Sequence, residues 1–532
     1  MDYLVVALIV IICLFANRIS DKIGLPALVA FMLLGTLFGA DVPFRIAFEN
    51  FSLGEKICSA ALIFIMFYGG FNLKWKQARS AAPFAITLST AGVLLTVLFA
   101  TICLILLLQM DFKTAFLISS VLGSTDGASV FSILRRFRLN LKDNTASLLE
   151  IESGSNDPVA YMLTMIAIQM FLNTASSNIF IDVALQLGGG VAFGWFGATL
   201  CQKLFHIKNL VSSSMASLAM IGMVLLCYGA ASVCKGNAYL SVYIMGILVG
   251  NQPLPFKKDL IAFFDGLTTI AQTLIFFVLG LLSFPSLMIE LLPTSLSIFL
   301  ILLVIARPLA VLLCSFPFHS NWKRNLLISF AGLRGAASGV FAAMAVAAGV
   351  ILPKNLFQIV FMVTLLSVTL QGTLLPWAAK KLDMIDENED VFKTFNDYVE
   401  EASLSLMSVK ITKHHPWNQL LIKEVGFPKD TLGILVERNN ERLACRGDLR
   451  LETGDLLVLS VPPYESAANE VMEERVLDAA DPYVGKSLKD LDLDAQTLIA
   501  LIRRDGQTLV PDGSTILAAG DQLVIYRGTT AL

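Results

Sequence analysis

The sequence contains little charge. Only 15% of its 532 residues are charged and 56% are hydrophobic, whereas a soluble globular protein carries about 25% charged residues. Residues 1–381 are a succession of apolar runs, and roughly 20 apolar residues cross a bilayer. This composition disfavours a soluble enzyme and predicts an all-α polytopic membrane domain over residues 1–381. We expect membrane lipid around it and no nucleic-acid partner.

Metal-binding and disulfide motifs are also scarce. The eight cysteines form no Cys-x-x-Cys pair, so the sequence indicates neither a zinc site nor a disulfide framework. Only four histidines occur. The first apolar run lacks a preceding basic segment and an Ala-x-Ala site, so we expect a first membrane helix and no cleavable signal peptide. No resident cofactor is predicted.

The apolar runs predict thirteen membrane helices. We place them at residues 3–20, 26–41, 55–71, 83–109, 114–134, 144–172, 180–204, 213–234, 238–250, 262–283, 291–315, 323–349 and 356–380. With the N-terminus outside, the cytoplasmic loops hold seventeen Lys and Arg residues and the outer segments hold five. Because cytoplasmic loops carry an excess of Lys and Arg, this asymmetry supports the count and predicts a cytoplasmic tail after residue 381.

A few ionisable residues lie within the predicted spans, where a charge costs at least about 2.5–3.5 kcal/mol on insertion scales. They concentrate in the fifth, sixth and twelfth spans: Asp126; Glu150, Glu152 and Asp157; and Arg334. Glu150 lies nearer a basic loop, with which it can pair. Arg307, beside Pro308, is interpreted as structural.

Helical spacing arranges the polar residues of the segment LEIESGSNDPVAYM in two rows. Glu152 and Asn156 are i,i+4 neighbours, and so are Ser153 and Asp157. Carboxylate, hydroxyl and amide oxygens are hard ligands that suit an alkali cation or a proton. Asp157 has no second obvious cationic partner, so we predict it as the exchange site.

Two spans are predicted to be interrupted helices. In the fifth, GSTDGAS places Gly123 and Gly127 around three polar residues, and Asp126 can offset a positive helix end there. In the twelfth, GLRGAAS places Gly335 where helices can approach closely, and Arg334 can offset negative helix ends. Interrupted helices in corresponding positions are typical of secondary transporters with inverted repeats.

The motifs STDGAS, ESGSNDP and GLRGAAS, in this order, resemble those of the bacterial NhaP-like branch of the monovalent cation/proton antiporter family. The resemblance covers about residues 1–381. It implies thirteen helices, with the fifth and twelfth broken and crossing, in a homodimer of the bacterial cytoplasmic membrane. It also implies these roles: Asp157 carries proton and cation in turn; Thr125 and Ser153 are hydroxyl ligands, beside Asp126; Asn156 and Glu152 form the supporting network; Arg334 is the partner of Glu152.

Two details of the motifs refine the expected exchange. An Asn-Asp pair at 156–157, in place of Asp-Asp, implies electroneutral one-for-one exchange in this family. Many sodium-type members have Thr-Asp-Pro where this chain has Thr125, Asp126 and Gly127. The resemblance is therefore better to potassium/proton members.

The tail contains an internal repeat. The segments that begin at Leu421 and Ser487 align without a gap at a shift of 66 residues, which places Arg438 on Arg504. Each predicts short strands separated by turns, with a helix before them. The repeat resembles tandem RCK C-terminal (TrkA-C) domains, which implies control of potassium transport by a small ligand.

We divide the cytoplasmic part into a linker at 382–405 and two small α+β RCK-C domains at 406–465 and 472–532. The resemblance includes members that bind cyclic di-AMP, but it indicates no ligand residues here. No GxGxxG follows a strand in this tail, which disfavours NAD control. A tail that only stabilises a dimer is the alternative.

We therefore predict a secondary antiporter that exchanges K⁺, or alternatively Na⁺, for H⁺ in pH homeostasis, with regulation by its tail. An RCK-gated potassium channel is the alternative from another class, but a TVGYG filter is absent. A ligand sensor with a mere membrane anchor would not need thirteen spans. The ion preference, the transport direction and the sign of tail regulation stay open.

Overall fold

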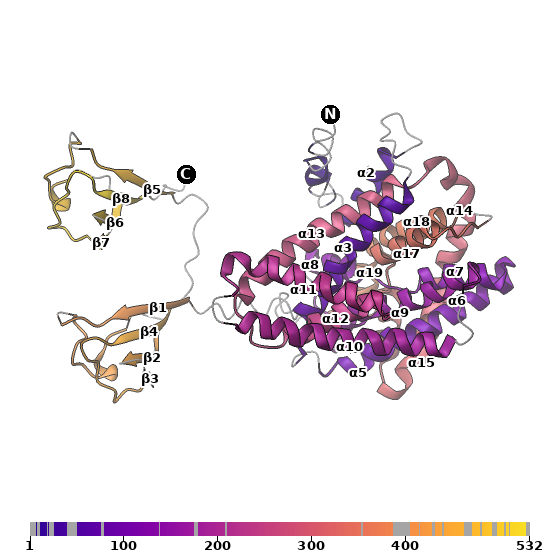
Figure 1. Ribbon diagram of the computed structural model, residues 1–532, viewed down its shortest axis with the longest axis horizontal. Helices are drawn as coiled ribbons and strands as arrows, with labels where there is room; N and C mark the ends of the chain where they lie inside the picture. Colours follow the sequence, from indigo (N-terminus) through magenta and orange to yellow (C-terminus); the bar gives the residue numbers. More distant parts are fainter. Residues whose placement is uncertain are drawn as a thin grey trace. The chain divides into compact units, whose positions relative to one another are not determined.

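The computed structural model describes most of the chain. The described residues are 7, 11–16, 18, 20, 26–39, 50–75, 79–137, 139–174, 179–207, 210–352, 355–386, 405–413, 415–427, 431–438, 441–461, 471–478, 481–491, 497–504, 507–509 and 511–527. They form two compact units, Met1–Val399 and Glu400–Leu532. The first is helical and the second is built from strands (Figure 1).

The helices of the first unit follow the apolar runs. They are α2 (Ala27–Leu37), α3 (Phe51–Asn72), α5 (Ala82–Thr87), α6 (Val93–Leu108), α7 (Phe112–Val121), α8 (Gly127–Arg136), α9 (Thr145–Phe171), α10 (Ile179–His206), α11 (Ser213–Val233), α12 (Ala238–Gly250), α13 (Lys257–Leu281), α14 (Pro285–Leu300), α15 (Arg307–Ser315), α16 (Trp322–Phe330), α17 (Ala336–Ala347), α18 (Leu356–Leu366) and α19 (Gly372–Lys381). Single π-helical turns join α5 to α6, α14 to α15 and α18 to α19: η1 (Leu88–Gly92), η2 (Ile301–Ala306) and η4 (Ser367–Gln371).

These helices confirm the predicted class of an all-α membrane domain. In the described part of the chain, seven helices are long and apolar enough to cross a membrane, and four more are shorter and apolar. The second to the thirteenth predicted spans each coincide with a helix, a π-jointed helix or a broken pair. The first span, at 3–20, lies mostly outside the described residues, so the count of thirteen stays a prediction.

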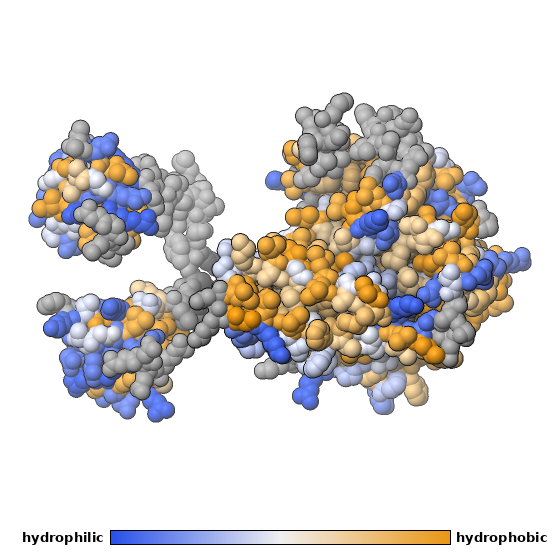
Figure 2. Space-filling view, viewed as in Figure 1, coloured by the Kyte–Doolittle hydropathy of each residue, from blue (hydrophilic) through white to orange (hydrophobic). Residues whose placement is uncertain are grey.

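The outer surface of this unit is apolar. Large side chains on α10 and α11 point outward, including Phe180, Trp195 and Leu218, each more than half exposed. Figure 2 shows apolar residues over much of the visible face of the helical unit. A surface of this kind fits the hydrocarbon core of a bilayer, which contains no water. Inside, α3 packs against α12, α13 and α17.

The fifth and twelfth spans are broken, as predicted. The backbone leaves the helix between α7 and α8 and again between α16 and α17. The two breaks touch, because the Asp126 backbone N–H donates a 2.7 Å hydrogen bond to the Leu333 carbonyl. A β-carbon at Gly335 would lie 2.2 Å from that of Asp126. Glycine is therefore required at 335 for this contact.

The chain is anchored where it leaves the last helix. Residues 383–386 pair with the loop before α9: Lys142 N–H donates to the Met384 carbonyl and Asp386 N–H to the Asn140 carbonyl, both at 2.9 Å. The Asp383 carboxylate lies 3.0 Å from Lys142 Nζ and 3.7 Å from Lys323 Nζ on α16. The segment that precedes the tail is thus tied to both broken spans. Most of the predicted linker, residues 387–404, lies outside the described residues.

The second unit contains two four-stranded sheets of identical strand order. The first holds β1 (Ser405–Lys410), β2 (Leu432–Arg438), β3 (Glu441–Ala444) and β4 (Leu456–Val461) in the order β1-β4-β2-β3, and the second holds β5 (Val471–Val476), β6 (Thr497–Arg504), β7 (Gln507–Leu509) and β8 (Gln522–Arg527) in the order β5-β8-β6-β7. Both sheets are antiparallel, and the bulge at 433–435 recurs at 499–501. The repeat seen in the sequence is therefore a repeat of structure.

A strand, and not the predicted helix, precedes each repeat in the described residues. β1 and β5 pair with β4 and β8 along their full length, which satisfies a backbone edge that would otherwise be open. Each sheet buries one arginine-linked acid: Arg438 donates two 2.8 Å hydrogen bonds to Asp455, and Arg504 donates two of 2.7 Å to Asp521.

Candidate ion-binding site

Asp157 lies beside a cavity within the helical unit. The cavity has a volume of about 470 Å³, and its walls come from α3, α8, α9, α13 and α17 together with the break before α8. Asp157, on α9, is only 7% exposed. Its carboxylate accepts a hydrogen bond from the Ser124 hydroxyl. Of the predicted site residues, those that line this cavity are Thr125, Asp126, Gly127, Ser153, Asp157 and Gly335.

Behind Asp157, a buried polar network connects α9 to the break. The Asn156 side-chain amide donates to the Thr125 hydroxyl and, at 3.3 Å, to Glu152. Thr125 in turn lies 3.3 Å from the same carboxylate. Within the part of the chain that the structure describes, the side-chain oxygen Oδ1 of fully buried Asn156 has no hydrogen-bond partner. The network therefore holds Thr125 in place and leaves one amide oxygen unused.

Charged side chains offset the helix ends that the breaks create. Asp126 precedes α8 and accepts a 3.3 Å hydrogen bond from the Ser129 backbone N–H and one of 2.6 Å from Ser129 Oγ, so it caps the positive end of that helix. Buried Arg334 donates from Nη1 to the carbonyls of Leu122 and Ser124, at the negative end of α7. Asp126 and Arg334 therefore each lie at the end of a broken helix, where their charges oppose the helix dipole.

The predicted pair of Glu152 with Arg334 is wrong in this structure. Glu152 Oε2 lies 3.1 Å from Nη2 of Arg307, and both side chains are almost fully buried. Nε and Nη2 of Arg307 have no hydrogen-bond partner among the residues that the structure describes, so the contact is an ion pair without hydrogen-bond geometry. Arg334 is engaged by the carbonyls of the other break. Arg307, interpreted from sequence as merely structural, is the residue that neutralises Glu152.

The remaining predicted residues serve close packing at the break. The Ser153 hydroxyl accepts a hydrogen bond from the Gly127 backbone N–H at the start of α8. A β-carbon at Gly127 would lie 2.2 Å from Ser153 Oγ. Gly123 lies outside the cavity, against Val97. Ser153 thus faces the cavity with one lone pair already used.

Two features of the site were missed from the sequence. Ser124 is the donor to Asp157, although its place in GSTDG beside Thr125 was a usable signal. The other is a stripe on α13, where Asp265, Thr268 and Gln272 line the cavity. Their spacing of three and four residues puts them on one helix face. Exposed Asp265 also accepts a 3.1 Å hydrogen bond from the Tyr68 hydroxyl.

A family model for the transmembrane part of sodium/hydrogen exchangers matches residues 4–381, the range that contains the whole site. The chain belongs to this family. Sodium/hydrogen exchangers are transporters and not enzymes, so the chain is a multi-pass cation/proton antiporter. A TrkA-C domain model matches residues 472–526, which include the second sheet.

Relatives within this exchanger family extend over most of the chain. The K(+)/H(+) antiporter NhaP2 of Shewanella baltica (strain OS223) is 30% identical over 462 residues, 86% of this chain and 80% of the relative. The K(+)/H(+) antiporter NhaP of Alkalimonas amylolytica is 31% identical over 499 residues, 90% and 85% of the two chains. The sodium proton antiporter MjNhaP1 from Methanocaldococcus jannaschii, solved at pH 8, is similar in structure, with a TM-score of 0.63 and 25% identity over 71% of this chain and 97% of that one.

Proposed function

We propose that the protein exchanges K⁺ for H⁺ at Asp157, one for one. The observation that carries the proposal is the way in which the buried charges around the two helix breaks are engaged. Glu152 is neutralised by Arg307, Asp126 caps α8 and Arg334 caps α7. Asp157 accepts only the Ser124 hydroxyl among the hydrogen bonds and ion pairs of the described residues. It borders a cavity large enough for a partly hydrated cation.

A buried carboxylate without a cationic partner among the described ion pairs explains electroneutral exchange. A buried charge is stable only when it is paired, so Asp157 favours either a proton on its own oxygen or a cation beside it. In either case the site as a whole carries the same charge. The oxygens of Ser124, Thr125 and Ser153 are hard donors for the dehydrated cation. The Asn156–Glu152 network positions Thr125 among them.

Potassium is proposed over sodium on two grounds. Glycine follows Asp126, where many sodium-type members have proline, and the two bacterial relatives are named as K(+)/H(+) antiporters. The archaeal structural neighbour is named as a sodium antiporter. Sodium exchange is therefore the alternative outcome of the same test.

The test uses proteoliposomes with a fluorescent pH reporter inside. An acid interior is imposed, then K⁺ or Na⁺ is added outside, for wild type and Asp157→Asn. We expect K⁺ to release protons from wild type and the variant to lose at least 100-fold in rate. Proton release on addition of Na⁺ alone would mean that the exchanged cation is sodium and not potassium. Potassium flux without proton movement would support a channel, and unchanged exchange in the variant would reject Asp157.

We further propose that the tail regulates exchange through the anchored segment 383–386. This segment contacts the loop before α9 and, through Asp383, Lys323 of α16. A small ligand at the TrkA-C domain could therefore bias both broken spans. The proposal includes an outer N-terminus, a cytoplasmic tail and a homodimer. Protease access to the tail in sealed vesicles and the mass of the detergent-solubilised protein test these last points.

A further inference from the structure

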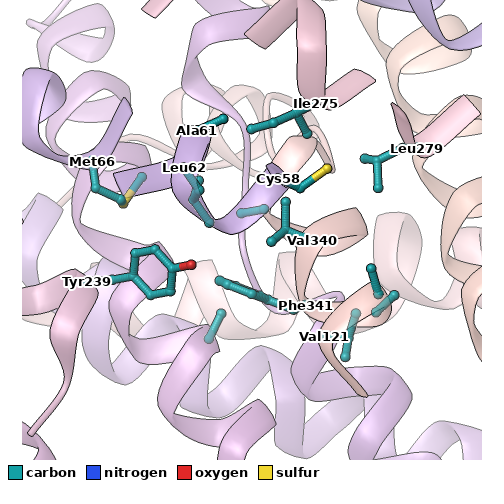
Figure 3. Packing of buried hydrophobic residues seen from close by; sticks show 14 of the residues in the cluster. Cys58, Ala61, Leu62, Met66, Val121, Tyr239, Ile275, Leu279, Val340 and Phe341 are labelled. Carbon is teal, nitrogen blue, oxygen red and sulfur yellow. The ribbon is translucent and has the colours of Figure 1, made fainter. Parts of the chain in front are cut away.

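The ion site is open on one side and closed on the other. The cavity beside Asp157 is lined by the C-terminal half of α3, from Leu62 to Asn72, and by the start of α17 at Ala336 and Ala337. One turn further along, the same helices are tightly packed. Figure 3 shows Cys58 and Leu62 of α3 against Val340 and Phe341 of α17, with Tyr239 of α12 beside them. We call this packed layer the closed half.

The closed half contains a polar group that packing does not explain. Tyr239 is 1% exposed, and its hydroxyl makes no well-formed hydrogen bond within the described residues, although the hydroxyls of Ser59 and Tyr228 lie close to it. Its ring lies edge-on to Tyr161 and Tyr228, with centroids 4.9 and 5.3 Å away. A buried hydroxyl without a partner costs about 1–3 kcal/mol. Phenylalanine would pack equally well there, so the hydroxyl points to a use in another conformation.

A half-buried carboxylate lies at the outer end of the same layer. Glu55, in the first turns of α3, accepts a 2.7 Å hydrogen bond from the Ser59 hydroxyl. Ser59 is buried and lies close to the Tyr239 hydroxyl. Glu55 is also within electrostatic reach of Tyr161 and Tyr228. The carboxylate therefore lies on the side of α3 that carries Ser59.

These groups lie in a row between Asp157 and the start of α3. Tyr161 follows Asp157 by four residues on α9, so it lies one turn further on the same face. From Asp157, the order of polar groups is Tyr161, Tyr239, Ser59 and Glu55. The row runs away from the cavity, toward the end of α3 that starts at Phe51.

We propose that Glu55 is the carboxylate that receives and releases the cation and the proton at the face opposite the cavity. In the conformation open to that face, the hydroxyls of Tyr239 and Ser59 line the way from Glu55 to Asp157. The assignment rests on the proposed exchange function. It makes Glu55 specific for one side of the membrane, unlike Asp157, which serves both.

The experiment measures exchange with the cation supplied at one face at a time. Vesicles of a single orientation, sorted by protease access to the tail, carry wild type, Glu55→Gln, Tyr239→Phe or Glu290→Gln. Glu290→Gln is the matched control, because Glu290 also lies in the first turns of its helix, α14, but is exposed. Tyr239→Phe preserves the ring and removes only the hydroxyl.

We expect Glu55→Gln to raise the KM for cation about tenfold at the Glu55 face and less than twofold at the cavity face. Tyr239→Phe should lower the maximal rate in both directions about threefold and raise the unfolding temperature, because a buried hydroxyl without a full partner is removed. Equal KM values at both faces in Glu55→Gln, or an equal effect of Glu290→Gln, would overturn the assignment. If wild type does not exchange at all, the proposed function fails first and the role of Glu55 falls with it. If wild type exchanges and Asp157→Asn does not, the proposed function stands, and the KM values of Glu55→Gln at the two faces decide the role of Glu55.

Discussion

Buried acids occur in both units of the protein, but they differ in how many hydrogen bonds their carboxylates accept. In the sheets, Asp455 and Asp521 are 1% and 0% exposed, and each receives two hydrogen bonds from an arginine and one from a backbone N–H. In the helical unit, Asp157 is nearly as buried but receives one hydroxyl hydrogen bond. A carboxylate whose partners are complete stabilises the fold. One whose partners are incomplete retains the capacity to bind a cation.

The largest effect on stability should come from breaking the buried ion pair of Glu152 with Arg307. Asp157 has no such partner in the described ion pairs. Glu152→Gln leaves Arg307 charged and unpaired in the membrane, so we expect a loss of about 3–5 kcal/mol in stability. Thermal unfolding in detergent, followed by size-exclusion chromatography, measures it.

The double variants decide which arginine is the partner. Glu152→Gln with Arg307→Gln should recover most of the unfolding temperature, because both charges are removed. Glu152→Gln with Arg334→Gln should recover none, since Arg334 binds the α7 carbonyls. If the unfolding temperature recovered only with Arg334→Gln, Arg334 would be the partner of Glu152, as the sequence predicted.

A smaller effect is expected from the paired acids of the sheets. Asp455→Asn and Asp521→Asn should each cost about 1.5–3 kcal/mol, the usual worth of hydrogen bonds to a charged group. Limited proteolysis of the tail in the full chain measures the loss. Asp448→Asn, on an exposed loop of the first sheet, is the control and should behave as wild type. Unequal losses at 455 and 521 would contradict the structural equivalence of the repeats.

The same acids give the tail a predictable pH dependence. Burial opposes the charge of Asp455, but hydrogen bonds from Arg438 and from the Glu452 N–H outweigh it and hold the pKa of Asp455 below its usual range. The hydrogen bond from Arg504 lowers the pKa of Asp521 likewise. Because these pKa values are depressed in the folded state, the stabilisation is complete above the unfolded pKa of about 3.9 and is lost as pH falls through the folded pKa. Wild type and Asp455→Asn should therefore converge in protease resistance only in strong acid.

A moderate kinetic effect is expected at the cavity mouth. Asp265 is exposed and lines the cavity, so its charge raises the local cation concentration. Asp265→Asn should raise the KM at the cavity face about two- to fivefold, the effect of roughly 0.5–1 kcal/mol from an exposed charge. Asp259→Asn, outside the cavity on the same helix, is the control. An effect that persists in 0.5 M choline chloride would point to direct ligation instead of attraction.

The smallest effect should come from Asp383, which is fully exposed. Hydrogen bonding and attraction from Lys142, with a contribution from Lys323, lower the pKa of Asp383. Asp383→Asn should slow exchange less than twofold at low ionic strength. The difference should vanish near 1 M salt, because the Debye length falls to about 3 Å. A difference that does not depend on salt would mean that the charge of Asp383 is not the cause of the effect.

The sequence was most informative where the relevant geometry is local. Glu152 and Asn156 lie on one helix, and the hydrogen bond between their side chains follows from the i,i+4 spacing that the sequence shows. The partner of Glu152 depended instead on how α15 packs. The π-turn Ile301–Ala306 immediately before Arg307 shifts the phase of that helix, so a regular 3.6-residue period cannot place the guanidinium. The stripe on α13 was missed for a similar reason, because only tertiary structure shows which helix face borders a cavity.

The contact between the two helix breaks limits how the protein can move. Asp126 N–H is bonded to the Leu333 carbonyl, Arg334 reaches back to the Ser124 carbonyl, and Gly335 has no room for a side chain. Separating the breaks would strand these buried groups without partners, at about 1–3 kcal/mol for each. The breaks therefore behave mechanically as one rigid block. A motion of α17 relative to α3, against which it packs, would therefore carry both breaks together.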